Sequence, residues 1–112
     1  MDVTIYHNPR CGTSRKTLDL LRQKGIEPKV VEYLKTPPSA AELKRLLGLM
    51  GMKARDLVRK KEEAAAKLDL AMAEDRLIAA MVKDPILIER PIVVVGAKAR
   101  LGRPPEKVLE IL

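Results

Sequence analysis

Residues 3–33 read VTIYHNPRCGTSRKTLDLLRQKGIEPKVVEY, and this stretch decides the fold. Residues 3–7 are mostly β-branched or aromatic and precede an Asn-Pro turn, which predicts a short strand. A helix is expected over about 12–24, because Leu residues recur at helical spacing and Gly25 stands where a helix C-terminal glycine belongs. Residues 29–33 predict a second strand. Together these elements have the size of one βαβ unit, whose two strands are parallel.

The end of the chain predicts two more strands and a last helix. Residues 91–95 read as a buried strand, residues 96–97 as its turn, and residues 98–101 as a strand that returns antiparallel. Two prolines at 104 and 105 suit the first turn of a helix. Three residues of that helix are expected to face inward: Val108, Leu109 and Leu112.

A helical block separates these two halves. Ser39 and Glu42 form a capping box that opens a helix, which Gly51 ends. Residues 53–82 are rich in alanine and charged residues and contain neither Gly nor Pro, which predicts two or three short helices. Pro85 is expected to stop the last of them.

The order of elements is therefore βαβ, a helical block, and ββα. This order predicts an α/β protein with a thioredoxin-like, four-stranded mixed sheet and flanking helices. We expect one domain over residues 1–112, since this length is typical of a single domain. The helical insertion, at about 39–84, lies between the βαβ and ββα halves.

Composition limits the classes of partner. The chain has 22 basic and 15 acidic residues, a formal net charge of +7, which favours anions. Aromatic residues make up only 2% of the chain, so there is no platform on which the bases of single-stranded nucleic acid can stack. The basic residues are not clustered in the sequence. We expect no nucleic-acid partner.

One cysteine and one histidine exclude two further classes. The chain cannot form an intramolecular disulfide, and it lacks the four Cys and His ligands of a structural zinc site, so no metal is expected. No segment approaches the roughly 18–20 apolar residues that span a membrane, and the N-terminus lacks signal-peptide features. We expect a cytoplasmic protein, a monomer, without a membrane partner.

Cys11 lies between the first strand and the first helix. A thiol at a helix N-terminus faces the positive end of the helix dipole and N–H groups without intrahelical partners, which favour the thiolate and can hold an oxyanion. The basic residues Arg10 and Arg15, and His7, add to this effect. A lone cysteine is often a small buried apolar residue, but the neighbours of Cys11 are polar, basic and turn-forming.

Ser14 follows Cys11 at the spacing Cys-x-x-Ser. Its hydroxyl can donate a hydrogen bond to the thiolate, and the alternative is that it only caps the helix. Because no second cysteine exists, redox chemistry at Cys11 needs a thiol from another molecule. Tyrosine-phosphatase loops place Arg six residues after the nucleophilic Cys, where this chain has Thr17, so that class is excluded.

Arg90-Pro91 precedes the strand of the second half. In a thioredoxin-like fold this joint faces the N-terminus of the first helix, and its X-Pro bond is commonly cis, so we expect Arg90 to point toward Cys11. Arg59 and Arg103 have no special sequence context of their own.

Several separated segments resemble the glutaredoxin-coupled arsenate reductases, and the resemblance covers essentially the whole chain. These segments are IYHNPxCGTSR (5–15), YLxTP (33–37), LxRK (57–60), DRLI (75–78), PILIxRPIVV (85–94) and RLGRP (100–104). The Ala-rich residues 61–74 are shorter than in better-known members and carry no matched site residue.

The resemblance implies an arsenate reductase in which Cys11 attacks arsenate and holds an arsenic–sulfur adduct. It also implies that Arg59, Arg90 and Arg103 bind the oxyanion, a task suited to forked, permanently charged guanidiniums. Glutathione and glutaredoxin are the implied external thiols, with glutathione as co-substrate and no bound cofactor. The residues expected to bind substrate or to support the thiolate are His7, Gly12, Thr13, Ser14 and Arg15.

Two alternatives stay open. A reductase of glutathione mixed disulfides with the same fold would need Cys11 but not all three arginines. A redox regulator resembling the Spx family is the other alternative, although the Spx switch typically uses Cys-x-x-Cys where this chain has Ser14.

Overall fold

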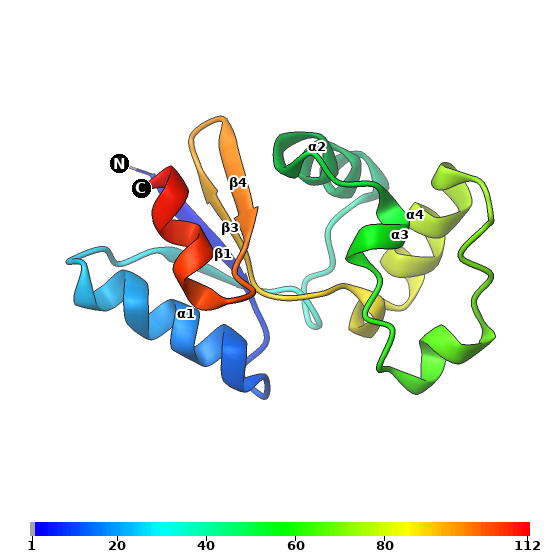
Figure 1. Cartoon of the computed structure of the whole chain (residues 1–112), viewed down its shortest axis with the longest axis horizontal. Helices are drawn as coiled ribbons and strands as arrows, with labels where there is room; N and C mark the ends of the chain where they lie inside the picture. Colours follow the sequence, from blue (N-terminus) through cyan, green and yellow to red (C-terminus); the bar gives the residue numbers. More distant parts are fainter. Residues whose placement is uncertain (1) are drawn as a thin grey trace. The chain divides into compact units, whose positions relative to one another are not determined.

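The strand β1 (Val3–His7) lies inside a four-stranded sheet of order β2-β1-β3-β4 (Figure 1). It pairs in parallel with β2 (Lys29–Glu32), with Ile5 opposite Val30, and antiparallel with β3 (Ile92–Val95), with Ile5 opposite Val93. The last strand, β4 (Lys98–Leu101), pairs antiparallel with β3. The predicted four-stranded mixed sheet is confirmed.

The computed structural model describes residues 2–112, and the chain divides into two units. We call the residues up to Thr36, together with Arg90–Leu112, the sheet unit, and Pro37–Glu89 the helical unit. Among residues 2–112, no helix combines the length and the apolar character needed to span a bilayer.

In the sheet unit, two helices pack on one face of the sheet. These are α1 (Gly12–Gln23) and the 3-10 helix η3 (Pro105–Ile111), which contact each other (Figure 1). The apolar core of this unit contains residues from two strands and two helices: Val3, Ile5, Leu18, Leu21, Val93, Val108 and Ile111. Alternate residues of β1 supply its sheet face, as a period of two requires. Gly25, just after α1, has φ +79°, a conformation that glycine adopts without strain.

The last helix differs from the sequence prediction. Val108 is buried, but Leu109 is 38% exposed, and Ile111 takes the inward position instead. The reason is the 3-10 geometry of η3, which places residues three apart on the same side and so aligns Val108 with Ile111. Leu112 is partly buried against the same core.

The helical unit is built around α4 (Glu74–Lys83), which contacts α2 (Ala40–Met50), α3 (Ala54–Leu57) and the 3-10 helix η2 (Pro85–Leu87). A further 3-10 helix, η1 (Glu63–Lys67), precedes α4. The predicted Ser39 cap of α2 is present: the Ser39 hydroxyl accepts from the N–H of Glu42, at 3.1 Å. The predicted short helices after residue 53 are confirmed as α3, η1 and α4.

Candidate active site

A tight loop places Cys11 at the start of α1. The carbonyl of Asn8 accepts from the N–H of Cys11 at 3.0 Å, and the Asn8 side-chain oxygen accepts from the N–H of Arg10 at 3.0 Å. The second bond is an Asx turn, in which a short side chain takes the place of a backbone acceptor. Cys11 then has the extended backbone of a helix N-cap, with φ −91° and ψ 121°. The strand β1 and the helix α1 therefore meet at the thiol.

The Cys11 thiol is partly exposed and favours the thiolate. Burial by itself would raise the pKa of Cys11. The groups that lower the pKa outweigh burial, so the pKa lies below its usual value. These groups are the backbone N–H of Ser14, the hydrogen bond from Arg103, the backbone N–H of Thr13 and the charge of Arg90. The sulfur makes no full capping hydrogen bond, so the N–H groups act on it chiefly as dipoles at the positive helix end. The helix N-terminus lowers the pKa as the sequence predicts, but the basic side chains that lower it are Arg103 and Arg90 rather than the predicted neighbours Arg10, Arg15 and His7.

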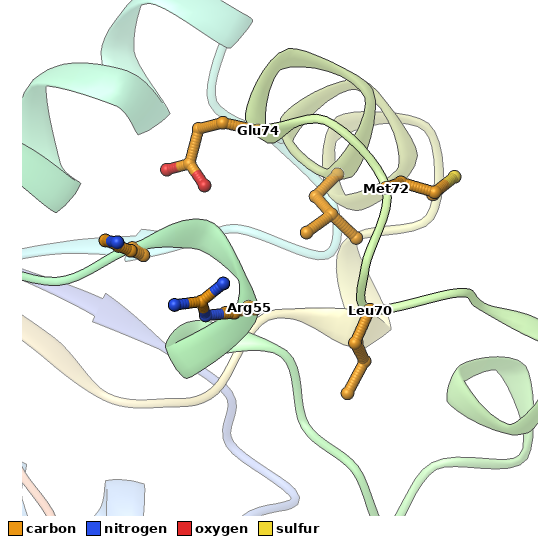
Figure 2. Close-up of a pocket in the computed structure, with 6 residues that line it drawn as sticks. Arg55, Leu70, Met72 and Glu74 are labelled. Atoms are coloured by element: carbon orange, nitrogen blue, oxygen red, sulfur yellow. The ribbon is translucent and has the colours of Figure 1, made fainter.

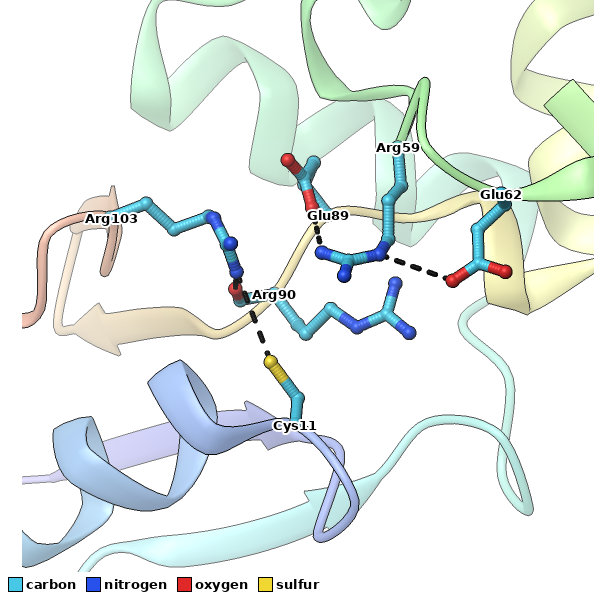
Figure 3. A network of polar contacts seen from close by, with 6 residues as sticks. All are labelled: Cys11, Arg59, Glu62, Glu89, Arg90 and Arg103. Atoms are coloured by element: carbon cyan, nitrogen blue, oxygen red, sulfur yellow. Dashed lines mark hydrogen bonds and ion pairs between the residues drawn. The ribbon is translucent and has the colours of Figure 1, made fainter.

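Arg103 and Arg90 lie with Cys11 in the sheet unit (Figure 3). The Arg103 Nη1 is 3.8 Å from the Cys11 sulfur and donates to the Arg90 carbonyl oxygen at 2.9 Å. Both Arg90-Pro91 and Arg103-Pro104 are cis peptide bonds, as expected for the first of them. Two arginines distant from Cys11 in the sequence thus contribute to one positively charged site around the sulfur.

His7 acts on this loop through Ser14. Its Nδ1 lies 2.6 Å from the Ser14 hydroxyl, which also accepts from the N–H of Asn8 at 3.1 Å. Burial is the main reason that the pKa of His7 is lowered; Glu32 opposes this, and Arg22 and Arg15 add to it. His7 is therefore neutral at neutral pH and supplies no positive charge to the thiol.

Ser14 differs from both of its predicted roles. It is the third residue of α1, and Cys11 occupies the N-cap position. Its hydroxyl is taken up by His7 and Asn8, and with a neutral His7 it can donate to Nδ1 while accepting from Asn8. The Ser14 backbone N–H, rather than the hydroxyl, is the group that favours the thiolate.

The other predicted residues of this loop lie in the first turn of α1. Gly12 is exposed, and the carbonyl of Thr13 accepts from the Thr17 hydroxyl at 2.9 Å. The exposed Arg15 folds back and donates to the carbonyl of Pro9 at 2.8 Å. Arg15 thus tethers the loop that precedes Cys11.

Arg59 belongs to the helical unit, where two carboxylates hold it (Figure 3). Its Nε is 3.1 Å from Glu62 and its Nη1 is 3.0 Å from Glu89. A short antiparallel bridge between Val58 and Ile88 brings the two segments together, since the N–H of Arg59 donates to Leu87 at 2.7 Å and the N–H of Glu89 donates to Leu57 at 2.9 Å. The Arg59 side chain is 20% exposed, so this guanidinium is oriented by partners within its own unit.

Sequence reasoning missed three polar residues around these sites. At Asn8 the sequence predicts only an Asn-Pro turn, yet Asn8 is buried and forms three of the hydrogen bonds that shape the loop. Glu62 had a local signal, because it follows Arg59 by three residues, a spacing that favours ion pairs. Glu89 had none, since thirty residues separate it from Arg59.

The helical unit also contains a shallow pocket away from the predicted residues (Figure 2). It is lined by Lys53, Arg55, Leu70, Met72, Glu74 and Leu77. The Glu74 carboxylate in it accepts from the N–H of Ala54 at 2.9 and 3.1 Å, so this acid is engaged in holding the start of α3. Within residues 2–112, no group of three or more His, Cys, Asp or Glu side chains is placed to hold a metal ion.

Known proteins resemble this chain over nearly its whole length. The arsenate reductase of Escherichia coli (strain K12) is 52% identical over 114 residues, covering 99% of this chain and 81% of that protein. A protein of the same strain named "Uncharacterized protein YfgD" is 57% identical over 114 residues, covering 98% and 96%. The structure named "Arsenate reductase from Vibrio cholerae" superposes with a TM-score of 0.96 at 53% identity, covering 100% of this chain and 98% of that one.

A protein-family model also matches this chain. The match runs from residue 6 to residue 111, and so includes the loop of Cys11, the Arg90-Pro91 joint and the segment of Arg103. The relatives share the fold as well as the sequence, which confirms the thioredoxin-like plan. The chain belongs to the ArsC family.

Proposed function

We propose that this protein is an arsenate reductase that converts arsenate to arsenite through an adduct on Cys11. One observation carries the proposal: a thiol whose pKa is lowered lies at a helix N-terminus, with the Arg103 guanidinium 3.8 Å from its sulfur. A thiolate is the nucleophile, and a nearby guanidinium offsets the repulsion between that thiolate and an approaching oxyanion. Membership of the ArsC family supports the same activity.

The first chemical step forms the arsenic–sulfur bond. The Cys11 thiolate attacks As(V), and one arsenate oxygen leaves as water after taking up protons. The N–H groups at the start of α1 and the guanidinium of Arg103 are donors for the remaining oxygens. Arg90, whose charge already acts on the sulfur, adds to the stabilisation of the anionic adduct.

The second step reduces arsenic with an external thiol. The glutathione thiolate attacks the Cys11 sulfur of the adduct, and a disulfide forms between Cys11 and glutathione. The arsenic–sulfur bond breaks with its electron pair left on arsenic, so As(V) becomes As(III) and leaves as arsenite. A glutaredoxin thiol then attacks the glutathione sulfur and frees Cys11. The single cysteine of the chain supports this scheme, because no internal thiol can resolve the intermediate.

Arg59 is proposed as a third oxyanion ligand, a role taken from the family resemblance. Its two carboxylate partners in the helical unit fix the guanidinium plane, since Glu62 contacts the Nε and Glu89 contacts the Nη1. We further propose that residues 1–112 act as one monomeric domain in the cytoplasm, with no bound cofactor.

A coupled assay tests the function. Arsenite formation is measured with arsenate, glutathione and glutaredoxin, and Cys11→Ser serves as the control. Arsenite that forms only with the wild-type thiol and only with both reductants supports the proposal. If arsenate is inert while a glutathionylated peptide is reduced through Cys11, the protein is a mixed-disulfide reductase and the proposal is wrong.

A further inference from the structure

We infer that Gly102 is a positioning residue that seats the Arg103 guanidinium at the Cys11 sulfur. The inference deepens the proposed function and rests on it for the meaning of the site, although the geometry belongs to the sheet unit alone. Gly102 is buried at the end of β4, immediately before Arg103. This position requires glycine because a larger residue would crowd the atoms around it.

Three atoms surround the position that a side chain at Gly102 would occupy. A Cβ built there would lie 3.0 Å from Pro91 Cγ, 3.0 Å from the Thr17 hydroxyl oxygen and 3.1 Å from Thr17 Cγ2. Such distances are shorter than ordinary contacts between these atoms, which lie at about 3.5–4.0 Å. Gly102 has no left-handed backbone that would itself demand glycine, so the restriction is steric.

The two residues that crowd this position, Thr17 and Pro91, are both held in place. Thr17 is fully buried in α1, and its hydroxyl donates to the carbonyl of Thr13. Pro91 is held by its own closed ring, and its carbonyl accepts from the N–H of Gly102 at 2.8 Å. An added methyl group would therefore displace the segment of Gly102 more readily than it would displace its neighbours.

Displacement of this segment would move Arg103. The next residue after Gly102 sends its Nη1 to the Arg90 carbonyl at 2.9 Å and to the Cys11 sulfur at 3.8 Å. The close approach of Gly102 to α1 and to Pro91 sets how near the guanidinium comes to the thiol. Contacts this short call for a displacement of a few tenths of an ångström. A displacement of that size would lengthen the two contacts of the guanidinium and so weaken them.

Gly102→Ala tests the inference, with Gly48→Ala as the matched control. Gly48 is exposed in α2, and an added Cβ there meets no atom within 4 Å. The pKa of Cys11 is measured from thiolate absorbance against pH and from the pH profile of alkylation by iodoacetamide, so the result does not depend on arsenate turnover. We expect Gly102→Ala to raise the pKa of Cys11 and to lower kcat/KM for arsenate about tenfold. Gly48→Ala should change neither.

A double-variant cycle shows whether the effect passes through Arg103. In an Arg103→Met background, Gly102→Ala should raise the pKa of Cys11 no further, because the guanidinium is already gone. An equal further rise would overturn the inference, since Gly102 would then act on the thiol by another route. A folded Gly102→Ala protein with an unchanged pKa of Cys11 would also overturn it.

A third variant keeps the test decisive if Gly102→Ala does not fold. Thr17→Ala removes two of the three short contacts, so Gly102→Ala is then compared with wild-type Gly102 in this background. The remaining 3.0 Å contact with Pro91 predicts a smaller rise in the pKa of Cys11. No difference in pKa between these two proteins would contradict the positioning role. A pKa rise without any arsenate reduction in the wild type would instead refute the proposed function and leave the positioning role standing.

Discussion

Arginine side chains have different partners in the two units. In the sheet unit, the Arg103 guanidinium contacts a backbone carbonyl and the Cys11 sulfur. In the helical unit, the Arg59 guanidinium is paired with the carboxylates of Glu62 and Glu89. The same residue type, given the same role by the family resemblance, therefore has different electrostatic surroundings. A guanidinium beside a thiol shifts the thiol toward its charged form, whereas one between carboxylates is held in place by them.

The two units also differ in net charge. The sheet unit has 12 basic and 6 acidic residues, a net charge of +6, while the helical unit has 10 and 9, a net charge of +1. Nearly all of the excess positive charge thus belongs to the unit that contains the thiol. Such an excess raises the local concentration of anions and the rate at which they arrive.

Replacement of the thiol should have the largest effect. Cys11→Ser is expected to abolish arsenate reduction, because Ser cannot form a reducible arsenic adduct. The side chain is partly exposed and nearly the same shape, so the fold should remain. Arsenite formation and circular dichroism measure the two properties. Substantial arsenite from a folded Cys11→Ser protein would show that the sheet unit does not hold the reacting group.

Arg103→Ala should have the next largest effect. We expect kcat/KM for arsenate to fall by about one to two powers of ten, since a charge-assisted hydrogen bond contributes about 1.5–3 kcal/mol. The pKa of Cys11 should rise, because a group that lowers it is lost. Arg103→Lys should restore activity only in part, as it keeps the charge but not the fork. An unchanged pKa in Arg103→Ala would remove the contrast with Arg59.

Arg59→Ala should combine a kinetic and a stability effect. We expect kcat/KM to fall by about one power of ten if Arg59 binds the oxyanion. The free energy of unfolding should also fall, by about 1 kcal/mol, because two half-buried carboxylates lose their shared partner. Urea denaturation measures the loss. Glu62→Gln with Glu89→Gln in the Arg59→Ala background should recover part of it, and no recovery would mean that the ion pairs do not stabilise the helical unit.

His7 should make the sheet unit sensitive to acid. The pKa of folded His7 is lowered, so below about pH 6.5 the unfolded chain binds the extra proton and the folded chain resists it. Its contribution is therefore complete above about pH 6.5 and is lost as the pH falls toward the folded pKa. Urea midpoints at pH 7 and pH 5 should diverge more in the wild type than in His7→Gln. Equal divergence would show that His7 is not held neutral.

The smallest effect is expected at an exposed ion pair of the sheet unit. Arg22 and Glu27 form a forked pair at 3.0 Å, but solvent reaches both side chains. Glu27→Gln should leave the urea midpoint unchanged within error, because exposed pairs lose in side-chain entropy and screening what they gain in attraction. A clear destabilisation would show that charge pairs in the sheet unit matter as much as those around Arg59.

The elements were predicted well where local signals agree. Each of these elements carries several signals within a few residues: hydrophobic periodicity, turn residues and helix caps. Such signals predicted the bounds of β1 and α1, the antiparallel return of β4 and the cap of α2. The inward face predicted for the last helix was wrong, because a 3-10 helix has 3.0 residues per turn and an α-helix has 3.6, so the two helices turn different residues toward the core.

By itself, the sequence determined the place of Cys11 at the start of a helix, the order of strands and helices along the chain, and that the chain has no second cysteine to form a disulfide with Cys11. Only the tertiary structure decided that Arg103 reaches the sulfur, that Gly102 permits this approach, that Glu89 holds Arg59 and that buried His7 is neutral. The physical reason is that these features depend on distances between residues far apart in the chain and on burial. Side-chain spacing encodes which face of an element is apolar, whereas close contact between elements is set by how their surfaces fit.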